Sequence, residues 1–178
     1  MSDVTWETEY SVEVAADATF AWTYMSDVRN WDDPPARFAL EGPFVSGGRG
    51  STEMPGQPAR HWQLRDVRPG ESYTVEFLLD RAALLFEWRF EEIDGGWARL
   101  TQRVLLAGEN AAAYLTDVQG AFSSSLEPGM RRIAGALDWA FGYETQKGKN
   151  NKELFGGNTS NKERYQDRTA APRGEEEK

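Results

Sequence analysis

The sequence of 178 residues contains no cysteine and a single histidine. Without cysteine there can be no disulfides, thiol nucleophiles or thiolate metal sites. With one imidazole, a transition-metal site would need carboxylate ligands, so we expect no metal and no cofactor. No segment approaches the roughly 18 consecutive apolar residues of a membrane span, and the sequence opens without a basic or apolar signal region. These absences predict a cytoplasmic protein that does not insert stably into a membrane.

Lysine is also absent from most of the chain. Residues 1–142 contain 12 arginines, 22 acidic residues and no lysine, a net charge of −10, whereas residues 143–178 contain all five lysines and carry a net charge of +1. An acidic body repels nucleic-acid phosphates and anionic lipid headgroups. We therefore expect no nucleic-acid partner, and a neutral or weakly charged ligand fits better. The seven Trp, nine Phe and six Tyr residues supply ample apolar area for one core.

The first two thirds of the chain have the pattern of antiparallel strands. From Val4 to Val14, apolar and polar residues alternate, which is typical of a strand with one buried face. Asp17 stands at the N-cap position of a short helix that contains Phe20. Glycine and proline breaks divide the next hundred residues into predicted strands at 37–45, 49–54, 60–68, 71–79, 82–93 and 96–107. Because the connections are short, these strands should form a consecutive antiparallel meander.

One parity of the meander is apolar and the other is charged. The apolar parity includes Tyr73, Phe77, Phe86, Trp88 and Phe90, and continues in the last strand with Leu100, Gln102, Val104 and Leu106. The opposite parity contains Thr74, Glu76, Glu87, Arg89, Glu91, Arg99 and Arg103, which predicts a solvated outer face with charge pairs between strands.

From Asn110, an expected N-cap, apolar residues recur at spacings of three and four as far as Phe141. This periodicity predicts a long amphipathic helix. Pro128-Gly129 should kink that helix or divide it into two helices in sequence, because proline removes an internal hydrogen bond. After residue 142 the sequence is polar and almost without aliphatic residues, so residues 143–178 are predicted to be a disordered tail beyond a domain of residues 1–142.

These features together resemble the START-like or Bet v 1-like (SRPBCC) superfamily, and within it the polyketide cyclase/dehydrase and lipid-transport group. The resemblance covers residues 4–141. The motifs that carry it are Val12 to Phe20, Ser26 to Trp31, Gly47 to Thr52, Asp66 to Gly70, Gly95-Gly96, Leu100-Thr101-Gln102 and the helix from Gly129 to Trp139. It implies an α+β helix-grip fold, a curved antiparallel sheet of about seven strands around a long C-terminal helix, with a cavity between them. Members include carriers, receptors, cyclases and chaperone co-factors, so the resemblance leaves the class of function open and carries over no catalytic residue.

The residues expected to line the cavity are Tyr10, Tyr24, Trp62, Tyr73, Phe77, Phe86, Trp88, Phe90, Gln102, Phe122, Leu126 and Met130. From residue type alone an ordinary core is the favoured interpretation, but the helix-grip fold that the resemblance implies favours a hollow. Gln102 is polar on an apolar parity and must find a hydrogen-bond partner, either in the protein or on a ligand. Tyr10 and Tyr24 could orient a ligand carbonyl or pack as amphipathic core residues.

Other candidates for chemistry have simpler readings. His61 could act as an acid or base, but strand alternation favours Trp62 inside and His61 outside. Asp32-Asp33 is interpreted as a turn before two prolines, and Gly47 to Gly50 as a hairpin turn, since no Lys-Ser/Thr follows as in a phosphate loop. Ser123-Ser124-Ser125 has no base nearby in the sequence, so covalent catalysis has no support.

The sequence thus predicts a protein that binds or carries a small hydrophobic molecule, such as a lipid or a polyketide. Two alternatives stay open at this point. The first is a cyclase or dehydratase in which polar cavity residues move protons. The second is a co-chaperone-like module that binds a protein partner. The oligomeric state, the ligand and the presence of any catalysis are not determined by the sequence.

Overall fold

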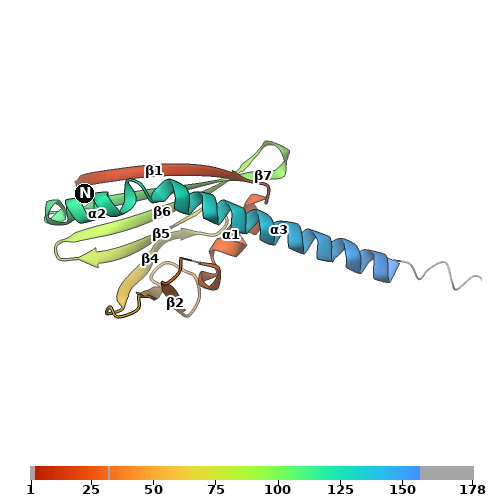
Figure 1. Ribbon diagram of the computed structural model, residues 1–178, viewed down its shortest axis with the longest axis horizontal. Helices are drawn as coiled ribbons and strands as arrows, with labels where there is room; N and C mark the ends of the chain where they lie inside the picture. Colours follow the sequence, from red (N-terminus) through yellow and green to blue (C-terminus); the bar gives the residue numbers. More distant parts are fainter. Residues whose placement is uncertain (1–2, 32, 157–178) are drawn as a thin grey trace, which may run out of the picture. The chain divides into compact units, whose positions relative to one another are not determined.

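The computed structural model describes residues 3–31 and 33–156, and its core is a single seven-stranded antiparallel sheet (Figure 1). The strands are β1 (Val4–Val14), β2 (Arg37–Glu41), β3 (Arg49–Glu53), β4 (Arg60–Arg68), β5 (Ser72–Leu79), β6 (Ala82–Ile93) and β7 (Trp97–Ala107). They lie in the order β1-β7-β6-β5-β4-β3-β2, so β1 and β2 are the edge strands. The helices are α1 (Ala18–Met25), α2 (Leu115–Phe122) and α3 (Leu126–Gly156), with short 3₁₀ turns η1 (Val28–Asn30), η2 (Asp94–Gly96) and η3 (Ala111–Tyr114).

The predicted meander is confirmed, with strand ends within one residue except at β2. That strand ends at Glu41 because Gly42 has a φ of +81°, which turns the chain out of the sheet. Asp17 is confirmed as the cap of α1, since its carboxylate accepts a 2.7 Å hydrogen bond from the backbone N–H of Phe20.

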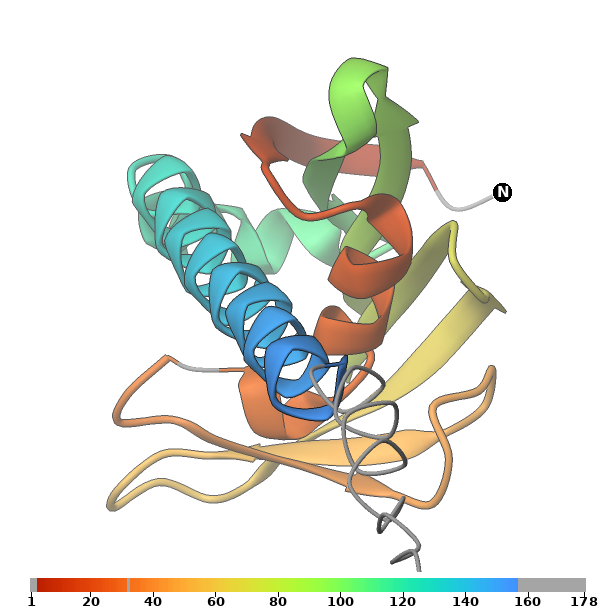
Figure 2. The ribbon, with the colours of Figure 1, turned by 90° about the vertical axis from the view of Figure 1, so that its right-hand side faces the viewer.

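The strand register places the apolar parity on one face of the sheet. Trp88 of β6 lies between Tyr73 of β5 and Gln102 of β7, and Gln102 in turn lies beside Tyr10 of β1. Figure 2 shows α1 and the first half of α3 on the side toward which the sheet curves. We call this side of the sheet the concave face. The main core lies between it and these two helices, with the buried Met130 and Leu137 of α3 packed against the strands.

The sequence predicted that Pro128-Gly129 would either kink the C-terminal helix or divide it into two helices. The helix is divided, but the division lies at Ser123–Ser125 and not at Pro128. Pro128 is the third residue of α3. The N–H groups of a first helical turn have no intrahelical partner, so proline costs little there. Asn110 is not a side-chain cap, because its amide instead donates a 3.2 Å hydrogen bond to the carbonyl oxygen of Asp80.

The outer face of the sheet is charged as predicted, with two exceptions, Thr74 and Glu76. Arg89 pairs with Glu9 at 3.0 Å, Arg99 pairs with Glu13 at 2.8 Å, and Arg103 bridges Glu7 and Glu87.

Thr74 and Glu76 were both expected to be solvated, but Thr74 is only 8% exposed. Glu76 is only 4% exposed. Its neighbours on β4 cover it: the Arg65 guanidinium donates to it at 2.7 Å, and the Gln63 amide donates to its second oxygen. A buried carboxylate needs hydrogen-bond partners, and both oxygens of Glu76 have one. Glu76 therefore belongs to the packed interior and not to the solvated face.

The chain divides into a compact unit that ends at Phe141 and a second that begins at Gly142. Residues 143–156 differ from the prediction of a disordered tail, because they are helical as the continuation of α3. Extending an existing helix adds one hydrogen bond for each residue fixed, and Glu, Gln and Lys are good helix formers. The rest of the predicted tail lies outside the described residues, and the domain boundary stays a prediction. None of the described helices combines the length and apolar character needed to cross a membrane.

Candidate functional site

One end of the concave face is filled by a cluster of aromatic rings centred on Tyr73. The rings of Phe44, Trp22 and Phe90 lie 4.9, 5.9 and 6.0 Å from the Tyr73 ring, and those of Trp88 and Trp31 stack on it at 6.1 and 6.4 Å. Such distances are those of favourable aromatic pairs. The Tyr73 side chain is 1% exposed, so this end of the face is packed.

The Tyr73 hydroxyl is buried without a hydrogen-bond partner among the residues that the structure describes. Burial raises the pKa of this phenol well above its ordinary value, which keeps it neutral. Leaving a hydroxyl unpaired in this way costs about 1–3 kcal/mol. The hydroxyl oxygen has almost no accessible surface, so a ligand could reach it only if the surrounding rings moved.

Trp62 closes this packed end, and Gly50 makes room for it. The two residues are paired across β3 and β4, and a Cβ placed on Gly50 would lie 2.1 Å from the indole ring. The indole N–H donates to the Thr52 hydroxyl at 3.1 Å, and the side chain is 3% exposed. Sequence reasoning placed Gly50 in a hairpin turn and missed this role. A glycine at an apolar-parity position of a strand is the signal that could have shown it.

The other end of the concave face is less tightly packed. Phe77 and Phe86 of the sheet and Phe122 of α2 are all partly exposed, although they point toward the same space. The Phe86 ring contacts Phe77 at 5.7 Å and Phe122 at 5.3 Å, both in edge-to-face geometry. We call these three residues the open end of the concave face. They present aromatic surface that the described residues leave partly uncovered.

Gln102 lies on the concave face in β7, the strand next to the edge strand β1, between Tyr10 and Trp88 in neighbouring strands. It is partly exposed, and no described residue makes a hydrogen bond with its side-chain amide. The sequence left open whether the partner of Gln102 lies in the protein or on a ligand. The described residues do not supply a partner in the protein. The amide therefore offers two donors and one acceptor oxygen on a face that is otherwise apolar.

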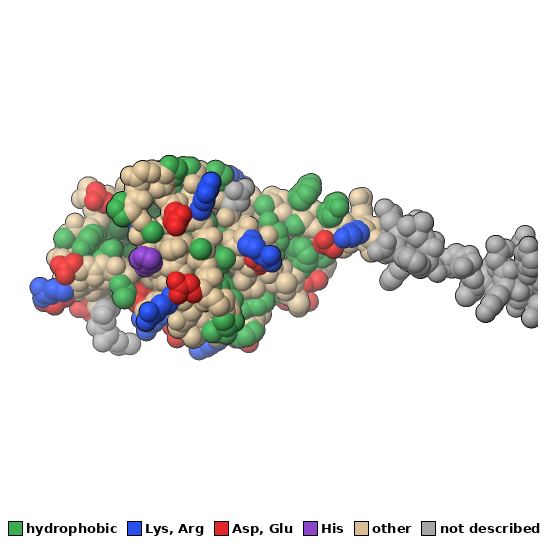
Figure 3. Space-filling view, turned by 90° about the horizontal axis from the view of Figure 1, so that it is seen from below, with side chains coloured by type: hydrophobic (Ala, Val, Ile, Leu, Met, Phe, Trp, Pro, Cys, Tyr) green, Lys and Arg blue, Asp and Glu red, His purple; other side chains and the backbone are tan. Residues whose placement is uncertain are grey.

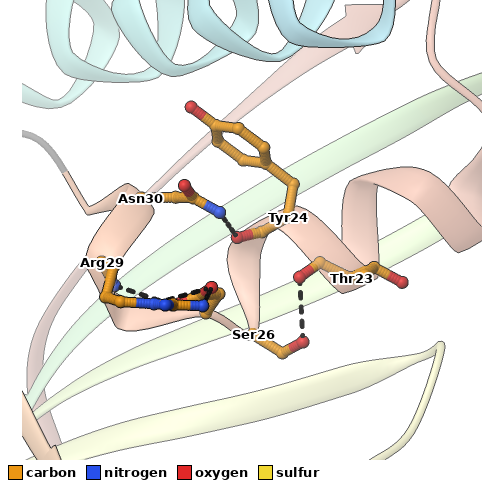
Figure 4. A network of polar contacts seen from close by, with 6 residues as sticks. Thr23, Tyr24, Ser26, Arg29 and Asn30 are labelled. Carbon is orange, nitrogen blue, oxygen red and sulfur yellow. Dashed lines mark hydrogen bonds and ion pairs between the residues drawn. The ribbon is translucent and has the colours of Figure 1, made fainter. Parts of the chain in front are cut away.

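The two tyrosines expected to orient a ligand have different surroundings. The Tyr10 hydroxyl accepts a 3.0 Å hydrogen bond from Arg131 of α3, so it is engaged at the β1 edge. Tyr24 lies in α1 with its ring directed toward α3, while the Asn30 amide donates to its backbone carbonyl at 2.9 Å (Figure 4). Below it, Arg29 and Asp27 pair at the surface, and this pairing lowers the pKa of the Asp27 carboxyl.

The remaining predicted residues, Leu126 and Met130, are buried in the main core. His61 is exposed and Trp62 is buried, which confirms the alternation expected for β4. In the space-filling view the histidine side chain lies at the surface, among mixed acidic, basic and apolar groups (Figure 3). Asp33 pairs with Arg132 at 3.0 Å, and Asp32 lies outside the described residues.

The surface of the described residues is hollowed beside β1 and beside β4. One hollow, of about 390 Å³, lies between β1 and α3 and includes Tyr10 and Arg131 in its wall. The other, of about 420 Å³, lies beside the Asp66 bulge of β4 and contains none of the predicted site residues. The assignment of the twelve cavity residues as ligand-binding stays a prediction.

A curved seven-stranded sheet that grips a C-terminal helix is the helix-grip α+β fold. Residues 5–138 match the family described as polyketide cyclase / dehydrase and lipid transport, and the chain belongs to that family. A search of the curated proteins found no match.

Several solved structures share the fold. Norcoclaurine synthase from Thalictrum flavum, in complex with dopamine and hydroxybenzaldehyde, has a TM-score of 0.59 at 14% identity, covering 78% of this chain and 87% of that one. The di-domain ARO/CYC StfQ of the steffimycin biosynthetic pathway has a TM-score of 0.56 at 18% identity, covering 79% of this chain and 52% of that one. Protein Ms6760 from Mycobacterium smegmatis has a TM-score of 0.55 at 19% identity, with coverages of 80% and 98%.

Proposed function

We propose that the protein binds a small, mostly apolar molecule on its concave face, between the sheet and helices α2 and α3. The observation that carries the proposal is the side chain of Gln102, an amide on an apolar face that has no hydrogen-bond partner among the described residues. Gln102 is only partly exposed, so its amide would need a new hydrogen-bond partner once an apolar molecule covered this face. A ligand carbonyl or hydroxyl at this position would satisfy the amide, while its apolar part would cover the open end.

The surroundings of Gln102 favour an aromatic or similarly flat ligand. Trp88 lies beside it, and Phe86 and Phe122 meet edge to face at the open end. Offset and edge-to-face ring contacts stabilise aromatic partners beyond their buried area. In the Thalictrum flavum synthase the same fold is in complex with dopamine and hydroxybenzaldehyde, which supports this class of ligand through the fold alone.

Binding or carriage is better supported than catalysis. An amide donates and accepts hydrogen bonds but does not exchange protons near neutral pH, so Gln102 can orient a ligand without acting as acid or base. His61 is exposed on β4, and its neighbour Trp62 is the residue whose side chain is buried. The cyclase or dehydratase alternative would depend on Tyr10, whose hydroxyl lies beside Arg131. The co-chaperone-like alternative has the outer face available, but there the charged side chains of β1, β6 and β7 pair with one another.

The experiment compares two matched ligands in displacement of Nile red, a neutral dye that fluoresces in apolar sites. Fluorenone and fluorene have the same ring system, and only fluorenone carries a carbonyl. A net hydrogen bond contributes about 0.5–1.5 kcal/mol, so the wild type should prefer fluorenone by roughly 2- to 10-fold. Gln102→Leu should remove the preference and leave fluorene binding intact or stronger.

The control is Gln119→Leu, the same change at an exposed position of α2. It should retain the preference for fluorenone. If the dye does not bind the wild type, or if both variants behave alike, the proposal is wrong. Absence of dye binding would favour the co-chaperone-like alternative, because that function does not require an accessible apolar face.

A further inference from the structure

The hollow between β1 and α3 opens beside the proposed ligand site. Its wall is formed by Tyr10, Ser11, Val12 and Glu13 of β1 and by Arg131 and Ala134 of α3. Tyr10 and Val12 also pack against the main core, so two of the residues that line the hollow belong to the concave face as well. Since β1 is an edge strand, the hollow follows a free edge of the sheet.

Arg131 is fixed at the rim of this hollow. Its guanidinium donates to the Glu127 carboxylate through Nε at 3.0 Å and through Nη2 at 2.8 Å, and Nη2 also donates to the Tyr10 hydroxyl at 3.0 Å. The guanidinium carbon lies 6.0 Å from the centre of the Tyr10 ring, within the range of a cation–π contact. These contacts hold the guanidinium without using Nη1, for which the described residues provide no hydrogen-bond partner.

The other polar groups of the hollow are already paired. The Ser11 hydroxyl shares a 2.8 Å hydrogen bond with Thr101, and Glu13 pairs with Arg99. The pKa of Glu127 is lowered, mainly by its hydrogen bond with Arg131 and to a lesser extent by one with Tyr10. Glu127 therefore stays ionised and orients the guanidinium. What the hollow offers a ligand is a positioned cationic donor next to the apolar surfaces of Val12 and Ala134.

We propose that this hollow binds the carboxylate of an amphiphilic ligand through Arg131, while the apolar part of the same ligand lies on the concave face. The inference rests on the proposed function, because Tyr10 connects the two places: its hydroxyl contacts Arg131, and its backbone pairs with Gln102. A charged acceptor suits Nη1, since hydrogen bonds between ionised groups are about twice as strong as neutral ones. The net charge of the chain, −9, opposes anions at long range, so the preference should be moderate and local.

The test uses fluorenone-4-carboxylate and its methyl ester as competitors for Nile red. In the wild type the acid should bind more tightly than the ester. Arg131 is 66% exposed, so Arg131→Met should weaken acid binding by about 5- to 10-fold, less than a fully enclosed ion pair would, and change ester binding less than 2-fold. Tyr10→Phe removes one anchor of the guanidinium and keeps its charge, and it should weaken acid binding by about 2- to 3-fold.

Arg132→Met is the matched control, because Arg132 pairs with Asp33, in the loop that precedes the opposite edge strand β2. This variant should bind both competitors like the wild type. If Arg131→Met leaves acid binding unchanged, or weakens acid and ester equally, the carboxylate site is refuted and ligand binding on the concave face stands. The same holds if the wild type shows no preference for the acid. If neither competitor displaces the dye, the proposed function fails and this inference fails with it.

Discussion

Replacing Gly50 with alanine tests whether one end of the concave face is solid. The new methyl group would lie 2.1–2.5 Å from three atoms of the Trp62 indole, where carbon atoms in normal contact are about 3.5–4.0 Å apart. The indole would have to move by more than about 1 Å. It has little freedom to do so, because Trp62 is 3% exposed and its ring lies 5.5 Å from that of Trp31.

The expected loss of stability follows from these contacts. Overpacking a filled core costs about 1–3 kcal/mol, and losing the hydrogen bond from the indole N–H to Thr52 costs about 0.5–1.5 kcal/mol more. The loss of glycine's freedom in the unfolded chain offsets about 0.4–1 kcal/mol. We therefore expect Gly50→Ala to lower the free energy of unfolding by about 1–3 kcal/mol.

Urea denaturation followed by circular dichroism measures this change as a lower midpoint with an unchanged slope. The control is Gly135→Ala, in an exposed part of α3 where an added Cβ meets no atom within 4 Å. That variant should gain about 0.5–1 kcal/mol from helix propensity. A Gly50→Ala protein within 0.5 kcal/mol of the wild type would refute the close packing of Trp62 against β3.

Three further predictions concern other parts of the molecule. Phe122→Trp adds volume at the open end, so it should change the free energy of unfolding by less than about 1 kcal/mol and reduce Nile red binding. Ready unfolding of this variant would instead indicate that the core is solid there. Glu76→Ala should cost about 1–3 kcal/mol in urea denaturation because it leaves Gln63 and Arg65 unpaired, whereas Glu9→Ala, at an exposed ion pair, should cost less than about 0.5 kcal/mol; equal costs would contradict the burial of Glu76. Deleting residues 145–178 should leave the melting temperature nearly unchanged, and a loss of more than about five degrees would show that they stabilise the body.

Local patterns in the sequence were sufficient to predict most of the fold. Glycine and proline breaks delimit the strands, and the alternation around Trp88 assigns the concave face, because a shift of one residue would expose every apolar side chain. The position of the helix break was less predictable. Pro128 is a strong helix breaker in sequence terms, but its effect depends on its distance from the helix start, which tertiary packing sets.

The site was harder to predict because its contacts join distant residues. The spacing of Glu127 and Arg131 shows a helical ion pair, but nothing local indicates that Tyr10, 121 residues away, receives a hydrogen bond from Arg131. Gln102 was identified because it breaks an apolar pattern, a signal that periodicity does provide. Glu76 follows the outer parity and gave no sign that Gln63 and Arg65 would cover it.

The central claim is that the open end of the concave face holds a small molecule. Native mass spectrometry of the protein purified from its host tests it most directly, with wild type and Phe122→Trp measured side by side. We expect the wild type to carry the mass of one small apolar molecule, which denaturation releases, and we expect Phe122→Trp to carry little or none. A wild type without bound mass, or equal amounts of the same molecule on both proteins, would contradict the claim.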